Sequence, residues 1–212
     1  MSHTFDDHAC AKASYSRQFT RRWFRVRNQS TFERLIKPHW VGQPITYLEV
    51  GVFEGQSLVW MLENVLTHRR AKAIGVDPWL MTLKIDADAM EAVMQRAHHN
   101  TEPWRSKCQL VRGASLDVLG RMTYRQGYMG VTKQSIDVCM IDGQHTDLGV
   151  WGDARLASLL VKPKGWLLFD DVVCTKRKSW HVRQGIDMFL NEAEGRVRFL
   201  WADKFMECYE VV

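Results

Sequence analysis

Residues 45–57 read ITYLEVGVFEGQS and combine an apolar run, two glycines and the start of a helical pattern. The run Ile45–Val50 is typical of a buried β-strand, and from Ser57 to Leu66 apolar side chains recur at helical spacing. Gly51 and Gly55 lie between the two and allow a tight turn with close backbone approach. The stretch therefore predicts a strand, a glycine turn and a helix, which is the repeating unit of α/β folds.

The same alternation continues to the end of the chain. We expect further strands at 71–76, 108–111, 136–141, 166–169, 196–201 and 205–212, and further helices at 86–98, 148–161 and 182–194. Lys162–Gly165 predicts a turn that stops a helix. Only Ala202–Lys204 join the last two strands, which is too short for a parallel crossover, so this pair must be antiparallel. The predicted fold class is α/β, a doubly wound, mostly parallel seven-stranded sheet with a C-terminal antiparallel hairpin.

Composition sets the class of protein. The chain has 212 residues, 46% hydrophobic and 25% charged, which suits one globular domain and excludes a disordered chain. It has no apolar run near the ~20 residues that span a bilayer, so no membrane partner is expected. The first ten residues do not resemble a signal peptide. The five cysteines are scattered, odd in number and never spaced as C-x-x-C, which favours a reducing cytoplasm.

The net charge of +5 is concentrated near the start of the chain. Residues 1–40 hold eight lysines and arginines against three acids, with aromatic residues between them. We expect residues 1–44 to form a basic N-terminal arm or helices, followed by the main domain at 45–212. A contact with nucleic acid through this arm is one interpretation. The alternative, which we favour, is a solvated segment that packs its aromatic rings on the domain, because no nucleic-acid-binding motif accompanies it.

Ligands of doubly wound sheets bind beyond the carboxyl ends of the strands, near the switch in strand order. The glycine turn after the first strand could hold an anionic group at the helix N-terminus. It lacks the dinucleotide fingerprint G-x-G-x-x-G, because Phe53 stands at the second glycine's place. An ordinary strand-to-helix turn is the alternative.

The second and third strands end in further candidates. Asp77 follows the second strand, where an acid can accept hydrogen bonds from ribose hydroxyls. It could instead only form the turn before Pro78. Trp79 could lie against an adenine or belong to the core. After the third strand, the Gly113–Ser115 loop could contact an adenine edge, and Ser115 is also a suitable helix N-cap.

Acids follow the fourth and fifth strands. Asp142 ends the fourth strand, and Asp170 and Asp171 end the fifth. If these strands are neighbours, about 4.8 Å apart, the carboxylates meet at one rim and favour a bound Mg²⁺, Mn²⁺ or Ca²⁺. His145, three residues after Asp142, could act as a general base. The alternative is that the acids form turns and His145 is solvated.

Together these residues resemble the class I S-adenosylmethionine-dependent methyltransferases, and most closely the small O-methyltransferases related to the macrocin and mycinamicin sugar enzymes. The resemblance covers residues 45–212. It implies a Rossmann-like methyltransferase fold and S-adenosylmethionine as cofactor. The cofactor-binding residues that it implies, together with the candidates above, are Glu49, Gly51, Phe53, Gly55, Ser57, Asp77, Trp79, Gly113, Ala114, Ser115 and Asp142.

The resemblance also implies the chemistry. In its metal-dependent members, acids that match Asp142, Asp170 and Asp171 hold Mg²⁺, and a histidine that matches His145 acts as base. The implied reaction is metal-assisted O-methylation of a hydroxyl on a small molecule or sugar, with His145 and Asp142 as catalytic residues. The Gly-Gly usual before the fifth strand is Lys164-Gly165 here.

Two other functions stay open from the residues alone. A nicotinamide-dependent oxidoreductase would use the same fold, although Phe53 in the glycine turn counts against it. A non-catalytic module would bind nucleic acid through the basic arm and carry a vestigial cofactor site. The intact acidic set counts against this second alternative.

Overall fold

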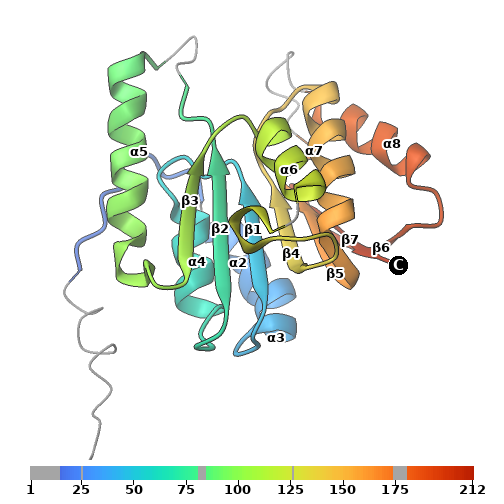
Figure 1. Ribbon diagram of the computed structural model, residues 1–212, viewed down its shortest axis with the longest axis horizontal. Helices are drawn as coiled ribbons and strands as arrows, with labels where there is room; N and C mark the ends of the chain where they lie inside the picture. Colours follow the sequence, from blue (N-terminus) through green and yellow to red (C-terminus); the bar gives the residue numbers. More distant parts are fainter. Residues whose placement is uncertain (1–14, 25, 81–84, 126, 174–180) are drawn as a thin grey trace, which may run out of the picture.

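The computed structural model describes residues 15–24, 26–80, 85–125, 127–173 and 181–212. A seven-stranded sheet lies at its centre, in the order β3-β2-β1-β4-β5-β7-β6, with helices to either side (Figure 1). Strands β1 to β5 run parallel, whereas β7 is antiparallel to both β5 and β6. The strands are β1 (Thr46–Val50), β2 (Lys72–Asp77), β3 (Cys108–Arg112), β4 (Ile136–Ile141), β5 (Val161–Phe169), β6 (Val197–Ala202) and β7 (Glu207–Val211).

Helices cover both faces of the sheet and bury two apolar clusters. One cluster lies under α4 (Gln56–Asn64), α5 (Ala87–Thr101) and the π-helix η1 (Phe32–Ile36). The other lies under α6 (Ser115–Tyr124), α7 (Asp147–Leu160) and α8 (Val182–Glu192). Strands buried on both faces read as continuous apolar runs, which is the pattern that the sequence shows. The predicted fold class is therefore confirmed.

Lys162–Gly165 differ from the prediction. Instead of a turn before the strand, they form an irregular part of β5, because Val161 pairs with Ile136 and Trp166 already pairs with Val138. Four residues therefore oppose one, and Lys164 takes a left-handed conformation with φ of 68°. The Lys-Pro-Lys-Gly signal correctly marked the end of α7, which stops at Leu160. The same signal did not show that pairing with β4 begins immediately after α7, at Val161.

The basic N-terminal segment packs against the domain. It contains α2 (Val26–Thr31), η1 and α3 (Lys37–Trp40). Phe32 and Ile36 of η1 are fully buried in the same cluster as α4. Residues 15–24, which we call the strap, run as irregular chain and bond to α4 and α5, for example through Arg17 to Glu63. This arrangement supports the packed alternative over a free nucleic-acid-binding arm for the described part, while residues 1–14 lie outside the described residues.

Candidate active site

The glycine turn follows β1, where the sheet order switches direction between β2 and β4. Gly51 has φ of 89°, and its amide donates to the carbonyl of Val76. A β-carbon on Gly51 would lie 2.0 Å from the carbonyl oxygen of Asp142. Only glycine fits here, because the turn after β1 and the loop after β4 touch through their backbones.

The rest of the turn is held in uncommon conformations. Phe53 has φ of 52°, and Gly55, the N-cap of α4, has φ of 79°. Trp79 and Asp171, at the ends of other strands around the same site, also have positive φ. Left-handed conformations of non-glycine residues cost free energy and concentrate at functional sites. The strand ends predicted from the sequence are therefore also where the described backbone carries much of its strain.

Glu49 lies beneath the turn and is fully buried. Its carboxylate accepts hydrogen bonds of 2.7 Å from the Tyr47 and Ser57 hydroxyls. Burial nevertheless raises the pKa of Glu49 to about 7. Because both oxygens are held by protein hydroxyls, the observed role of Glu49 and Ser57 is to join β1 to α4.

Asp77 ends β2 and points back to the glycine turn. One carboxylate oxygen accepts from the amides of Val52 and Phe53, both at 2.9 Å, and the other accepts from the Trp79 amide at 2.8 Å. Burial outweighs these three bonds and raises the pKa of Asp77 above its ordinary value. Asp77 thus shapes the turn, and its oxygens also lie where the sequence placed a ribose contact.

Trp79 and the loop after β3 both lie at the carboxyl ends of their strands, as the sequence predicted, but two details differ. Trp79 is 2% exposed and its indole N–H donates to the Phe53 carbonyl at 2.9 Å, which favours the core alternative over an adenine contact. Gly113 follows β3, Ala114 is the N-cap of α6, and Ser115 is its first residue rather than the cap. Asp153 of α7 is fully buried, and burial raises its pKa to about 6 although the Ser115 hydroxyl opposes the shift.

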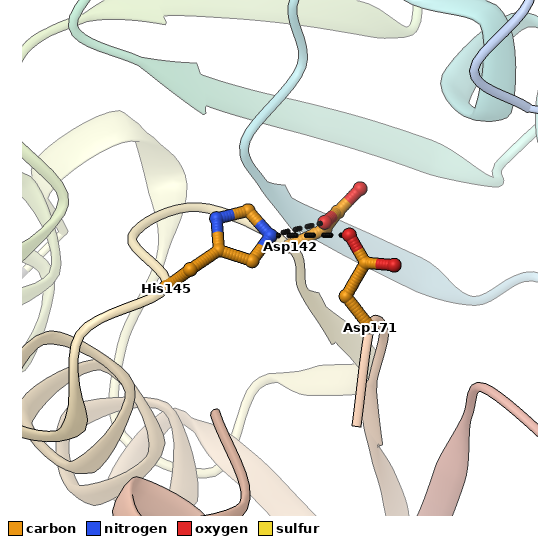
Figure 2. Close-up of side chains that lie close together, drawn as sticks. All are labelled: Asp142, His145 and Asp171. Carbon is orange, nitrogen blue, oxygen red and sulfur yellow. Dashed lines mark ion pairs between the residues drawn. The ribbon is translucent and has the colours of Figure 1, made fainter. Parts of the chain in front are cut away.

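Three side chains from the loops after β4 and β5 converge at the rim of the sheet (Figure 2). One ligand atom each from Asp142, His145 and Asp171 lies within 4.8 Å of the others. The His145 Nε2 atom is 3.3 Å from an Asp171 oxygen and 3.7 Å from an Asp142 oxygen. Ile141 pairs with Phe169, so β4 and β5 are neighbours as the sequence argument required.

The electrostatics of this cluster suit a cation. Burial, followed by the charges of Asp170 and Asp171, raises the pKa of Asp142 well above its ordinary value. Carboxylates this close repel each other unless a proton or a metal ion lies between them. The residues present therefore fit an oxygen-liganded divalent cation.

Asp170, predicted as the third acid of the metal site, is not one of the three clustered residues. It is 9% exposed, and its oxygens accept from the Asp171 amide at 2.9 Å and from the Asn28 side-chain nitrogen at 3.3 Å. Its charge still acts on Asp142. His145 takes its place in the cluster. The left-handed φ of 55° at Asp171 turns its side chain toward His145, whereas the Asp170 side chain bonds to Asn28.

Two further contacts at the site were not predicted from the sequence. Glu54, inside the glycine turn, is buried and bonds to the strap through the Thr20 hydroxyl at 2.6 Å and to Arg96 of α5 at 2.7 Å. Trp23 of the strap stacks on Phe53, with ring centroids 4.1 Å apart. The position of Glu54 between Gly51 and Gly55 could have marked it as a candidate residue. No pattern marked its partners, because the strap lies far away in sequence.

Comparison with known proteins identifies the family. Residues 48–172 match the family described as "Methyltransferase domain". The chain is 27% identical over 130 residues to the uncharacterized protein R132 of Acanthamoeba polyphaga mimivirus, covering 60% of this chain and 51% of that protein. It thus spans about half the length of that curated relative.

Two solved structures share the fold. An O-methyltransferase from Bacillus cereus in complex with S-adenosylhomocysteine (SAH) has a TM-score of 0.58 at 18% identity, with 96% of this chain and 86% of that chain covered. The TDP-rhamnose 3′-O-methyltransferase CalS11 of calicheamicin biosynthesis has a TM-score of 0.54 at 13% identity, with 79% and 72% covered.

The family match spans the glycine turn, Asp77 and the acids after β4 and β5, which form one site in the structure. It decides against the oxidoreductase alternative. Among the helices of the described residues, none combines the length and apolar character needed to cross a bilayer. The chain belongs to the methyltransferase-domain family.

Proposed function

We propose that this methyltransferase transfers the methyl group of S-adenosylmethionine to a hydroxyl oxygen, with a divalent cation at the acid cluster. The observation that carries the proposal is the convergence of Asp142, His145 and Asp171 beside the glycine turn. Asp142 belongs to both parts, because its amide donates to Val50 of β1 at 2.8 Å. The methyl acceptor and the methyl donor would thereby bind at adjacent loops.

The cofactor would lie along the strand ends. Gly51, Phe53 and Gly55 would hold the methionine part at the start of α4, where backbone amides suit a carboxylate. Asp77 would accept from the ribose hydroxyls, and the Gly113–Ser115 loop would contact the adenine. Glu49 and Ser57 would support the turn from below. The Trp79 ring would not contact the adenine, because it is buried.

Asp142 and Asp171 would hold the cation, with Asp170 beside them. When bound, Mg²⁺ would lower the pKa of an acceptor hydroxyl and orient it. His145 would take the hydroxyl proton at Nε2 as the new C–O bond forms and the C–S bond of the sulfonium breaks, releasing SAH. The nearby Asp142 and Asp171 carboxylates would stabilise the resulting imidazolium. Positioning the oxygen in line with the methyl group would supply much of the rate.

The proposed acceptor is a small molecule or a sugar with neighbouring hydroxyls, since two such oxygens can bind one cation together. The likeness to the rhamnose enzyme CalS11 supports a sugar. Nucleic acid stays the less favoured binding partner, because the described part of the basic segment packs on the domain. We also propose a reducing, cytoplasmic setting, which the free, buried Cys108, Cys139 and Cys208 support.

The test combines binding with methyl transfer. Calorimetry should detect binding of SAH, and a panel of catechols and nucleoside-diphosphate sugars should accept labelled methyl groups in Mg²⁺ but not in EDTA. Asp171→Asn and Asp142→Asn should each lower the rate at least about a hundredfold. Asp117→Asn, at an exposed acid of α6, is the matched control. Full activity in EDTA, or in both site variants, would refute the cation's role.

A further inference from the structure

Asn28 contacts Asp170, the acid next to the cluster, from outside the part of the chain that matches the family, residues 48–172. It lies in α2 and is 9% exposed. Its side-chain nitrogen donates to an oxygen of Asp170, 142 residues away in the chain, at 3.3 Å. Its carbonyl oxygen is buried and accepts no hydrogen bond within the described part of the chain.

These contacts fix the Asp170 carboxylate. One oxygen accepts from the Asp171 amide and the other from Asn28, so donors from two separate segments set its direction. The α2 helix is itself anchored, because the Thr31 hydroxyl bonds to Asp203 in the turn between β6 and β7. Without the Asn28 amide, this mostly buried carboxylate would lose a donor that comes from outside its own turn.

The unused carbonyl oxygen of Asn28 points to a missing donor. A buried oxygen without a hydrogen bond costs free energy, and native structures normally satisfy such atoms. Mg²⁺ usually keeps several of its water ligands when proteins bind it, and these waters are strong hydrogen donors. A cation at the neighbouring acids would bring such water to this place.

We propose that Asn28 is a positioning residue, which holds Asp170 toward the divalent cation and accepts a hydrogen bond from a water molecule bound to that cation. The inference rests on the proposed cation site. It adds that the segment before the family domain completes this site. The methyltransferase of this chain would therefore need α2 for cation binding as well as for packing.

The experiment measures Mn²⁺ binding to the full chain by electron paramagnetic resonance, with no acceptor present. Asn28→Ala removes the amide, and Asp170→Asn serves as the reference for losing the carboxylate. Thr31→Val is the matched control, because it loosens the same helix without touching Asp170. Calorimetry with SAH on every variant reports whether the cofactor side of the site remains intact.

We expect Asn28→Ala to weaken Mn²⁺ binding about tenfold or more and to change the Mn²⁺ spectrum, since hydrogen bonds to charged groups are among the stronger ones. Thr31→Val should stay within about twofold of the unchanged chain, and SAH affinity should not change. Equal Mn²⁺ affinity in Asn28→Ala, or an equal loss in Thr31→Val, overturns this inference alone. If the unchanged chain binds SAH but no Mn²⁺, the proposed cation site fails and this inference fails with it.

Discussion

Gly51 and Asp142 touch through their backbones: a β-carbon on Gly51 would lie 2.0 Å from the Asp142 carbonyl oxygen. One residue belongs to the cofactor turn after β1 and the other to the acid cluster after β4. The contact fixes the spacing of the two halves of the site. No side chain takes part, so it depends on glycine alone.

Gly51→Ala should therefore destabilise the protein by about 3 kcal/mol or more, since it combines left-handed strain with a backbone clash. Gly195→Ala is the matched control, because Gly195 also has positive φ but no atom within 4 Å of the added carbon. It should cost only about 1–2 kcal/mol. Urea unfolding measures both. Equal losses of stability in the two variants would show that conformational strain, not the contact with Asp142, is the reason for glycine at position 51.

Asp77→Asn should weaken SAH binding at least about tenfold. The neutral amide keeps a single acceptor oxygen, so it cannot serve the Val52, Phe53 and Trp79 amides together, and the glycine turn loosens. Asp86→Asn is the control, because Asp86 likewise accepts a backbone amide as the N-cap of α5. Calorimetry compares the affinities. Unchanged SAH affinity in Asp77→Asn would mean that the carboxylate is not needed at the cofactor site.

Glu54→Gln should release the strap. The side chain is fully buried, and removing its charge leaves Arg96 without its partner, at a cost of about 3–5 kcal/mol. Limited proteolysis should then cut within residues 15–24 much faster than in the unchanged chain. Glu63→Gln removes another acid bonded to the strap, but that acid is 44% exposed, so the variant should change little. Similar cleavage rates in the two variants would show that Glu54 does not hold the strap more firmly than Glu63 does.

Asp153→Asn should remove part of the pH dependence of stability. Burial raises the pKa of Asp153 to about 6 from 3.8, so the unfolded chain loses this proton first as the pH rises. Stability therefore falls between about pH 4 and pH 6, and the cost stays at higher pH, about 3 kcal/mol in all. The asparagine variant should be more stable than the unchanged chain at pH 8, with the difference vanishing near pH 3.5.

Thermal unfolding across this pH range, with the exposed Asp117→Asn as control, tests the sign. A variant that is less stable than the unchanged chain at pH 8 would show that the Asp153 carboxylate makes a net favourable contact instead, such as the one to Ser115.

The sequence determined where the seven strands fall along the chain, because apolar runs such as residues 136–141 and 166–169 report local burial. The helix α6 was not among the predicted helices. It also predicted which strand ends carry the candidate site residues, since a parallel sheet brings all its carboxyl ends to one edge. Asp77, Asp142 and Asp171 were found this way. The pairing of β4 with β5 was a condition of that argument, and the structure meets it.

Only the tertiary structure decided which way those side chains face and what reaches them from elsewhere. Asp170 and Asp171 are adjacent in sequence, but the positive φ of Asp171 turns it toward His145, whereas Asp170 bonds to Asn28. Trp79 is buried because the turn at Phe53 accepts its indole N–H. Contacts between residues over a hundred positions apart leave no periodic trace, because they arise from packing of whole elements rather than from local spacing.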